Sequence, residues 1–362
     1  MPWAQRLAPL LPGLRSLRHR LHRSPEIAFE EYNTASAVAG WLWGEAGLTP
    51  MAQGVGGTGL IFRVEGSGAG SAAPSVLLRS ELDGLPLIEA SGEEYSSEIH
   101  GRHHACGHDG HACMLAAALM LLHSHRDEWS GVVYGLFQPA EETGAGALAV
   151  LADTTAMTTL EDAGGVQRAF SMHNIPQRPL GQVMVRPEGT MCRASMGLRI
   201  QLRGVQSHAA MPWEGNNPML PLAKLAGVAA ELPSWHPAAD GEEPPICTLV
   251  HFNCGTVSTQ AILQLLVICR SSLTVCLRVQ RDYGVNPGVG DIGVTLRACS
   301  TAAVDAMAAE MQTAAEGIAR YHNLACEVVQ IDRFGATVND AESSAIAVAA
   351  ARRKQSVPID PD

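Results

Sequence analysis

The chain has 362 residues, of which 46% are hydrophobic and 17% charged, a composition typical of a folded globular protein and not of a disordered one. This length exceeds what one ordinary hydrophobic core accommodates, so we expect two domains. The formal net charge of −11 argues against nucleic acid or an anionic membrane as a partner.

The cysteines and the N-terminal residues bear on cellular location. Nine cysteines without regular spacing do not form the disulfide framework of a secreted protein and favour a reducing compartment. The N-terminal segment is basic as far as Glu26, and Pro9, Pro12 and Gly13 interrupt its apolar residues, which is not the pattern of a signal peptide. We expect a cytoplasmic protein, with organelle targeting by the basic N-terminus as the alternative. No apolar run reaches membrane-helix length, so no membrane association is expected.

The first elements alternate between helices and strands. Leucine and arginine at helical spacing predict a helix over residues 14–23, and a second helix is expected from the Ser-Pro at residue 24 to residue 47. Apolar runs predict strands over residues 59–66 and 75–87. The stretch "GVGGTG" at residues 54–59 matches a dinucleotide-binding pattern, but a strand-like segment follows it instead of a helix. We therefore reject a nucleotide site there.

Next come an apolar helix over residues 111–127 and a buried strand over residues 129–139. Helices alternating with nearly continuous apolar strands predict an α/β domain with a mainly parallel sheet. Polar groups follow the expected strand ends: Asp83, the 101–111 loop, Glu141 with Glu142, and His173. In such sheets the functional groups lie beyond the carboxyl ends of the strands.

From about residue 190 the order of elements becomes β-α-β-β-α-β, which is the ferredoxin-like α+β arrangement. We expect this unit to be inserted into the first domain. The expected parts are residues 1–187, residues 188–335 and a return to the first domain over residues 336–362. The expected strands and helices of the inserted unit cover residues 195–204, 216–232, 245–253, 290–300, 302–323 and 325–334.

The segment "GRHHACGHDGHACM" at residues 101–114 concentrates imidazole and thiol groups, which are ligands for borderline divalent metals. Cys106 and His108 form a C-x-H pair, for which a buried thiol beside surface imidazoles is the structural alternative. Glu141 and Glu142 are adjacent, so their side chains point in different directions and one could bind a metal while the other reaches its water. His173 alone is more typical of a packed histidine.

Taken together, these residues resemble the M20 metallopeptidase superfamily, specifically its amidohydrolase branch of aminoacylases, hippurate hydrolases and auxin-conjugate hydrolases. The resemblance rests on six segments in order: "LRHRLHRSPEIAFEEYNTA", "DGLPL", "HACGHDGHA", "LFQPAEE", "MHN" and "SHAAMPWEGNNP". It implies that the first domain binds metal and that the inserted domain is a lid and dimerisation domain.

The resemblance also implies residue roles in the first domain. Two divalent metal ions, zinc or manganese, would be bound by Cys106, His108, Glu142 and His173. Glu141 would be the general base that takes a proton from the metal-activated water and passes it to the leaving amine. Asp83 would orient the imidazole of a metal-binding histidine by contacting that ring without binding the metal itself.

In the inserted domain, His208 resembles the histidine that polarises the scissile carbonyl, often across a dimer. Asn286 and Arg297 resemble residues that hold the substrate carboxylate and neighbouring polar groups; a turn asparagine and a surface strand arginine are the structural alternatives. The implied function is hydrolysis of the amide bond of small-molecule N-acyl amino acid conjugates by a homodimer formed through residues 188–335. The acyl group and the amino acid stay open.

The chain departs from this family pattern in two places. Residues 257–282 form an insert where the family has none, for which a gene-model artefact is the favoured explanation and a real insertion the alternative. Family members also continue beyond this chain and supply a C-terminal histidine ligand, whereas no histidine follows His322. This departure implies a truncated chain of low activity, so the alternative function is an inactive member that keeps only a dimerisation or binding role.

Overall fold

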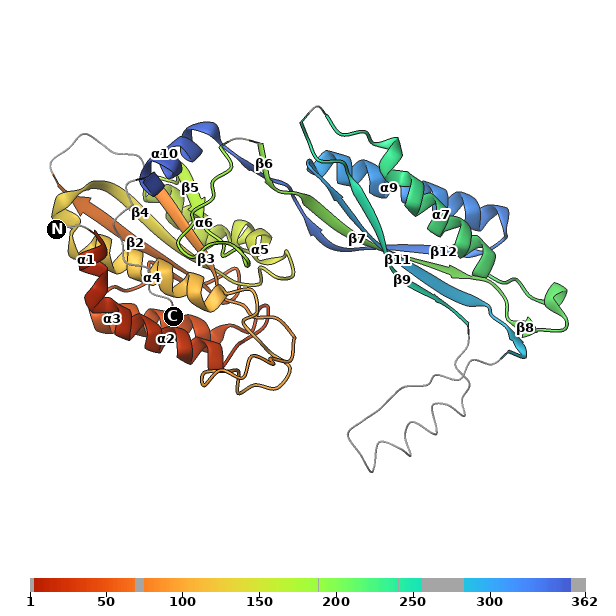
Figure 1. The fold of residues 1–362 in the computed structure, drawn as a ribbon, viewed down its shortest axis with the longest axis horizontal. Helices are drawn as coiled ribbons and strands as arrows, with labels where there is room; N and C mark the ends of the chain where they lie inside the picture. The colour runs from red at the N-terminus through yellow and green to blue at the C-terminus, as the bar shows by residue number, and fades with distance from the viewer. Residues whose placement is uncertain (1–2, 69–74, 188, 240, 256–282, 353–362) are drawn as a thin grey trace, which may run out of the picture. The chain divides into compact units, whose positions relative to one another are not determined.

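The computed structural model describes residues 3–68, 75–187, 189–239, 241–255 and 283–352, so the insert expected at 257–282 lies outside the described residues. The chain divides into two compact units (Figure 1). We call residues 1–185 together with the chain after Ser344 unit 1, and Arg186–Ser344 unit 2. Within the described ranges, no helix has the length and apolar character needed to cross a membrane.

The helices of unit 1 follow the apolar periodicity of the sequence. In α2, Leu14, Leu17 and Leu21 recur at helical spacing and are buried, while Arg15 and Arg20 between them are exposed. The helical elements that precede unit 2 are α1 (Trp3–Leu7), η1 (Ala8–Leu10), α2 (Leu11–Arg23), α3 (Tyr32–Ala46), α4 (His108–Ser124), η2 (Arg126–Glu128), α5 (Gly146–Ala152) and α6 (Thr154–Asp162).

The sheet of unit 1 has the order β1-β2-β4-β3-β5. Its strands are β1 (Ala52–Val55), β2 (Gly59–Ser67), β3 (Val76–Glu81), β4 (Ser130–Gln138) and β5 (Arg168–Ser171). Strand β3 runs parallel to both β4 and β5, while β2 is antiparallel to β4 and to β1. The predicted α/β class is therefore confirmed. The carboxyl ends of β3, β4 and β5 lie at one edge, which brings the segments that follow them together.

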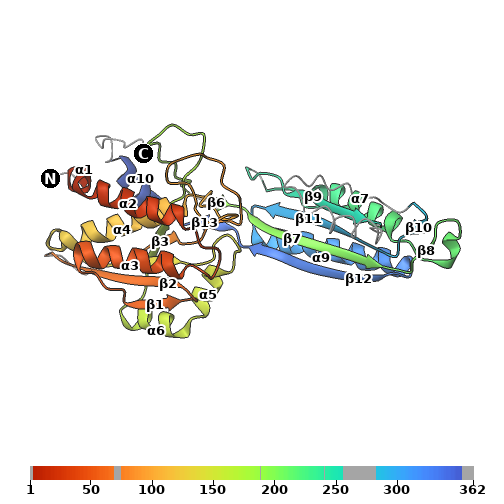
Figure 2. The ribbon, with the colours of Figure 1, turned by 90° about the horizontal axis from the view of Figure 1, so that it is seen from below.

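Helices cover both faces of this sheet (Figure 2). On one face, residues of α2, α3 and α4 pack in one cluster with Phe62 of β2 and Phe137 of β4. On the other face, Val150 of α5 and Leu160 of α6 pack with Ile61 and neighbouring apolar residues. The segment "GVGGTG" forms the turn between the antiparallel strands β1 and β2, so a strand and not a helix follows it.

Unit 2 contains the predicted β-α-β-β-α-β order. Its main sheet is antiparallel with the order β12-β7-β11-β9. The main elements are β7 (Ala194–Arg203), α7 (Met219–Trp235), β9 (Ile246–Cys254), β11 (Val289–Ala298), α9 (Thr301–Tyr321) and β12 (Ala325–Phe334). The shorter ones are β6 (Gly189–Cys192), β8 (Ser207–His208), η3 (Pro212–Glu214), β10 (Val285–Asn286) and β13 (Thr337–Asn339), and the second unit boundary falls within α10 (Ala341–Arg352).

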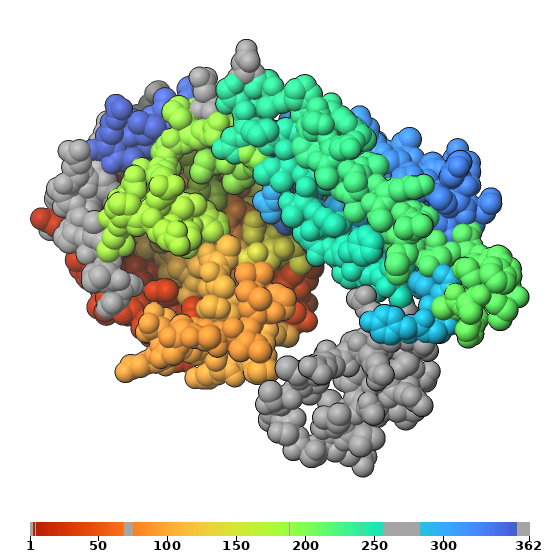
Figure 3. Space-filling model, turned by 45° about the vertical axis from the view of Figure 1, so that its right-hand side comes forward, coloured from red at the N-terminus to blue at the C-terminus, as the bar shows by residue number. Residues whose placement is uncertain are grey.

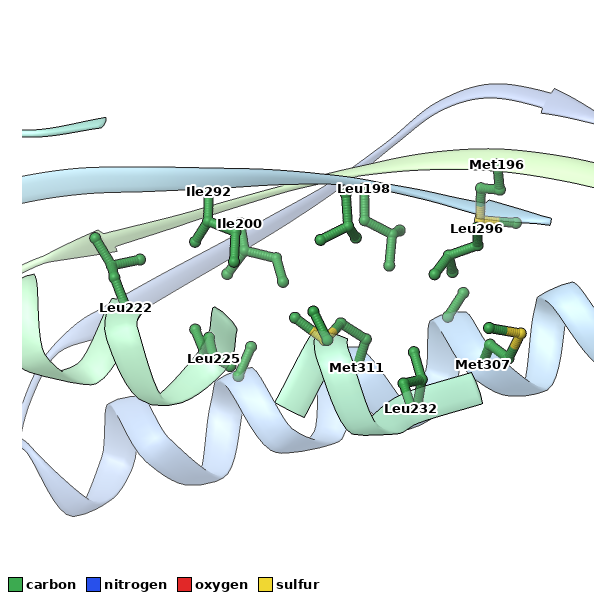
Figure 4. Packing of buried hydrophobic residues seen from close by; sticks show 14 of the residues in the cluster. Met196, Leu198, Ile200, Leu222, Leu225, Leu232, Ile292, Leu296, Met307 and Met311 are labelled. Atoms are coloured by element: carbon green, nitrogen blue, oxygen red, sulfur yellow. The ribbon is translucent and has the colours of Figure 1, made fainter. Parts of the chain in front are cut away.

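The core of unit 2 lies between the main sheet and the two helices α7 and α9 (Figure 4). Alternate residues of β7 are buried, among them Met196, Leu198 and Ile200, and their side chains point toward Leu225 of α7 and Met311 of α9. This alternation of buried and more exposed residues is what a sheet with one covered face requires.

Candidate metal centre

Three strand ends of unit 1 supply most of the candidate site. Asp83 lies two residues after β3, Glu141 and Glu142 follow β4, and His173 follows β5. Since β3 pairs in parallel with both β4 and β5, all of these residues lie at the carboxyl edge of the sheet. Cys106 and His108 reach the same edge from the loop that enters α4.

Gly107 allows α4 to begin beside this edge. Its backbone has φ +89°, a left-handed conformation that residues other than glycine rarely adopt. A Cβ atom here would also lie 2.6 Å from Oδ1 of Asn174, the residue after His173. The close approach brings Cys106 Sγ to 3.2 Å from His173 Nε2.

His108 is fully buried and its two ring nitrogens have different surroundings. Nδ1 lies 2.9 Å from the backbone oxygen of Asp83 and 3.3 Å from Oδ1 of the same residue. Both of these atoms are acceptors, so Nδ1 carries a hydrogen, and in the neutral ring Nε2 presents a lone pair. Nε2 lies 3.8 Å from Glu141 Oε2 and 3.9 Å from Glu142 Oε1.

Two buried atoms of this site have no hydrogen-bond partner among the described residues: His108 Nε2 and Glu142 Oε1. Leaving such atoms unpaired in the interior costs free energy, and a cation shared between them removes that cost. Glu142 is held in place because its backbone N–H donates to Asp83 Oδ2 at 2.9 Å. Asp83 therefore orients both an imidazole and the segment that carries a carboxylate.

The available ligands fit a divalent metal. One ligand atom from each of Cys106, His108 and His173 lies within 4.8 Å of the others, and the same holds for His108, Glu141 and Glu142. His108 belongs to both groups, so the two groups are adjacent. Thiolate, imidazole and carboxylate together suit zinc and similar first-row metals better than magnesium.

The electrostatics of the site favour the metal-binding form of the cysteine. Interactions with His108 and His173 lower the pKa of the Cys106 thiol, although burial acts in the opposite direction. Interaction with Cys106 raises the pKa of His173 to about 9 against the effect of burial. Burial raises the pKa of Glu142. The thiolate is the form that binds metal, so the surroundings of Cys106 prepare it for that role.

Sequence reasoning did not find Glu31, a completely buried carboxylate at the start of α3. Its Oε1 accepts a hydrogen bond from the backbone N–H of Ala140 at 2.8 Å, and its Oε2 accepts one from Thr58 Oγ1 at 2.6 Å. Ala140 has φ +48° and directly precedes Glu141. Glu31 thus fixes the backbone that presents Glu141. The only signal was its position within the family-like N-terminal segment.

Glu81 and His111 were also missed. Glu81 Oε2 lies 2.9 Å from His111 Nδ1, and His111 Nε2 accepts a hydrogen bond from the backbone N–H of Asn174 at 3.1 Å. This pair joins β3, α4 and the loop after β5, next to the candidate ligands His108 and His173. His111 is the last histidine of "HACGHDGHA", so the motif itself contained the signal.

The predicted residues of unit 2 lie on its strands. His208 of β8 is exposed, and its strand pairs with β10, so that Asn286 lies opposite Ser207. Asn286 donates to Ser207 Oγ at 2.9 Å and accepts from Asn217 Nδ2 at 2.7 Å. Arg297 is exposed on β11 opposite Ser195 of β7. The structure thus brings His208 and Asn286 near each other in a two-stranded sheet, whereas Arg297 lies in the main sheet, at the end of β11 remote from β10.

Comparison with known proteins identifies relatives of this chain. The model of peptidase family M20/M25/M40 matches residues 77–361. The chain is 34% identical over 227 residues to the N-acetylcysteine deacetylase of Bacillus subtilis, covering 61% of this chain and 54% of that protein. It is 37% identical over 206 residues to the IAA-amino acid hydrolase ILR1-like 5 of Arabidopsis thaliana, covering 56% of this chain and 44% of that protein. The chain spans about half the length of these curated relatives.

Solved structures share the fold. The Bacillus subtilis YXEP protein, described as a dinuclear metal-binding peptidase from the M20 family, has a TM-score of 0.68 at 25% identity, covering 94% of this chain and 79% of that one. The aminobenzoyl-glutamate utilization protein from Klebsiella pneumoniae, at 19% identity, has a TM-score of 0.65, covering 98% of this chain and 84% of that one. The family match over most of the chain, together with the shared fold, shows that this chain belongs to peptidase family M20/M25/M40.

Proposed function

We propose that this chain is a metal-dependent amidohydrolase that cleaves the amide bond of N-acyl amino acid conjugates. The observation that carries the proposal is the pair of buried, unpartnered atoms His108 Nε2 and Glu142 Oε1, 3.9 Å apart at the carboxyl edge of the sheet. Cys106 and His173 lie beside them. A cation bound between His108 Nε2 and Glu142 Oε1 would offset the free-energy cost of burying these two atoms without partners.

In this proposal two divalent ions, zinc or manganese, are held by Cys106, His108, Glu142 and His173. Bound ions would supply charge that polarises the scissile carbonyl and lowers the pKa of a water molecule. Glu141 accepts the proton of that water and delivers it to the leaving nitrogen. Its side chain is 31% exposed and its Oε2 is 3.8 Å from His108 Nε2, so it can face both the site and an entering substrate.

The substrate class is inferred from the names of the relatives. One acts on N-acetylcysteine and the other on conjugates between IAA and amino acids, and both substrates join an acyl group to an amino acid through an amide bond. We therefore propose a small N-acyl amino acid as substrate.

Unit 2 is proposed to act as a lid and to form a homodimer through residues 188–335. His208 would polarise the carbonyl, while Asn286 and Arg297 would hold the substrate carboxylate and neighbouring polar groups of the substrate. The exposure of His208 and Arg297 supports these roles, because both side chains are accessible to a ligand. Light scattering of the purified chain should give the mass of a dimer, and a monomeric mass would contradict this part of the proposal.

The activity is tested with the full chain loaded with zinc or manganese and offered N-acetyl-L-cysteine and an IAA-amino acid conjugate. Glu141→Gln should lower turnover by about 10²–10⁴-fold, the range for a lost general base, while the metal content stays unchanged. Glu161→Gln changes an exposed glutamate of α6 and serves as the matched control. Metal binding without turnover of either substrate by the unaltered chain would contradict the hydrolase assignment and favour a binding role.

A further inference from the structure

A second group of metal-binding side chains lies in unit 1 apart from the candidate metal centre. It consists of His22 in the last turn of α2, with Glu89 and His103 from the irregular segment 82–107, whose exposed residues form part of the surface of the unit (Figure 3). His22 Nε2 is 3.2 Å and His103 Nε2 is 3.6 Å from the same atom, Glu89 Oε1. One ligand atom from each of the three side chains lies within 4.8 Å of the others.

The surroundings of His22 fix which of its nitrogens faces the group. Nδ1 lies 2.8 Å from Asp109 Oδ2, and a carboxylate can only accept, so Nδ1 carries the hydrogen. In a neutral ring, Nε2 then presents its lone pair to Glu89 Oε1, which also has lone pairs. Two acceptors 3.2 Å apart require a positive charge between them, either a second proton on His22 or a metal ion.

The spacing distinguishes these two choices. Zinc binds nitrogen and oxygen at about 2.0–2.2 Å, which in tetrahedral geometry places neighbouring ligand atoms about 3.3–3.6 Å apart. The separations of 3.2 and 3.6 Å in this group are close to that range. The second separation is longer than a hydrogen bond, so a proton on His22 accounts for the first contact only, whereas one cation bound by all three side chains accounts for both.

The groups behind the three side chains are also those of a metal site. Asp109 is 1% exposed and is held by Arg18 Nε at 3.3 Å, so Asp109, His22 and the cation position form a carboxylate–histidine–metal arrangement. Glu89 is fixed by the backbone N–H of Ser97, which donates to its other oxygen at 2.6 Å. The His22 and Glu89 side chains are 8% and 4% exposed, while His103 at 21% leaves access for a water as fourth ligand.

We propose that His22, Glu89 and His103 bind a further divalent cation of the zinc type. Two imidazoles and one carboxylate favour such a metal over magnesium or calcium. The ion would join α2 to the segment 82–107 and would stabilise unit 1. The proposal is independent of the proposed hydrolase activity, because it involves none of the residues assigned to that reaction.

The test measures zinc per chain in the full-length protein by equilibrium dialysis and elemental analysis. His103→Gln should bind one zinc ion fewer than the unaltered chain. His19→Gln is the matched control, because His19 stacks on Tyr95 at 4.0 Å and belongs to no metal-binding group in the described residues. In a background with Cys106→Ser and His173→Asn, one zinc ion should remain, and His103→Gln should remove it.

A second measurement does not depend on altered side chains. In the zinc-saturated unaltered protein, nitrogen NMR of His22 should show Nδ1 protonated and Nε2 bound to metal. Equal zinc content in the His103→Gln and His19→Gln proteins would overturn the proposal. A His22 ring that stays doubly protonated at saturating zinc would also overturn it, because a proton would then occupy the place of the metal.

Discussion

The interiors of the two units differ in chemistry. In the described part of unit 2, Asp291 is the one buried carboxylate or imidazole, and the core between the main sheet and its helices is apolar. Unit 1 buries a group of nine: His22, Glu26, Glu31, Glu81, Asp83, His104, His108, Asp109 and His111. Most of these lie around the carboxyl edge of the sheet or behind the loop that enters α4.

This difference shows how the two units are stabilised. Unit 2 gains free energy from apolar surface removed from water. Unit 1 also contains groups whose burial costs free energy unless other charges, hydrogen bonds or metal ions compensate. Removing a buried apolar side chain from unit 2 should therefore lower the stability of the protein. Removing a buried polar side chain without a partner from unit 1 should keep or raise it.

The largest effect is expected in unit 2. Leu198→Ala removes a side chain that is 2% exposed and should lower the free energy of unfolding by about 2–5 kcal/mol, because a cavity remains in the core. Leu220→Ala is the matched control, since Leu220 is 74% exposed and its loss should change stability by no more than about 0.5 kcal/mol. Denaturant unfolding measures both values. Similar losses for the two variants would contradict the assignment of the core.

The opposite effect is expected for His104 of unit 1. This side chain is 3% exposed, and neither ring nitrogen has a hydrogen-bond partner among the described residues. Burial lowers the pKa of His104 from 6.5 to about 4. The unfolded chain therefore takes up this proton at higher pH than the folded chain, so stability is lost as the pH falls below 6.5 toward 4.

His104→Leu removes this cost. Between pH 7.5 and pH 5, the metal-free unaltered protein should lose about 2 kcal/mol more stability than the variant. At neutral pH the variant should be at least as stable as the unaltered chain, because it buries no unpaired polar atom. Thermal or denaturant unfolding at the two pH values gives the comparison. A pH dependence identical in both proteins would show that His104 is not the titrating group.

A smaller effect is expected at Gly107. Gly107→Ala places a side chain at φ +89° and against Asn174, which should cost about 1–2 kcal/mol and weaken metal binding at Cys106. Gly44→Ala is the control in helix α3, where an added Cβ meets no atom within 4 Å. That change should stabilise the chain by about 0.5–1 kcal/mol, because alanine favours the helix. Effects of the same sign would contradict the conformational argument.

The sequence predicted unit 2 well, because the order of its elements follows from periodicity along the chain. In unit 1 the second helix was expected from residue 24 but begins at Tyr32. The reason is that Glu26 accepts hydrogen bonds from the backbone N–H groups of Asn33 and Thr34, at 3.2 and 2.7 Å, and so caps the helix from outside it. A glutamate before a helix carries no local signal for this role.

In the candidate metal centre, too, local sequence pattern indicated some residues, whereas others depend on tertiary contacts. Strand ends and the histidine-rich segment indicated Cys106, His108 and one of the two residues Glu141 and Glu142 from local pattern alone, and the family resemblance selected Glu142. Glu31 acts on Ala140, which is 109 residues away, and this contact exists only after the sheet and α3 have packed. Contacts over such sequence distances depend on the tertiary structure, so periodicity and motif spacing do not predict them.

The most direct test of the metal centre uses cobalt in place of the native ion. Cobalt bound to a cysteine thiolate gives an intense near-ultraviolet charge-transfer absorption, which ligands without sulfur do not give. We expect this band in the cobalt-loaded chain, its loss in Cys106→Ser, and its retention in Cys192→Ser, which changes an exposed cysteine of unit 2. A cobalt-loaded chain without the band, or a Cys106→Ser protein with the same band, would contradict the centre formed by Cys106, His108, Glu142 and His173.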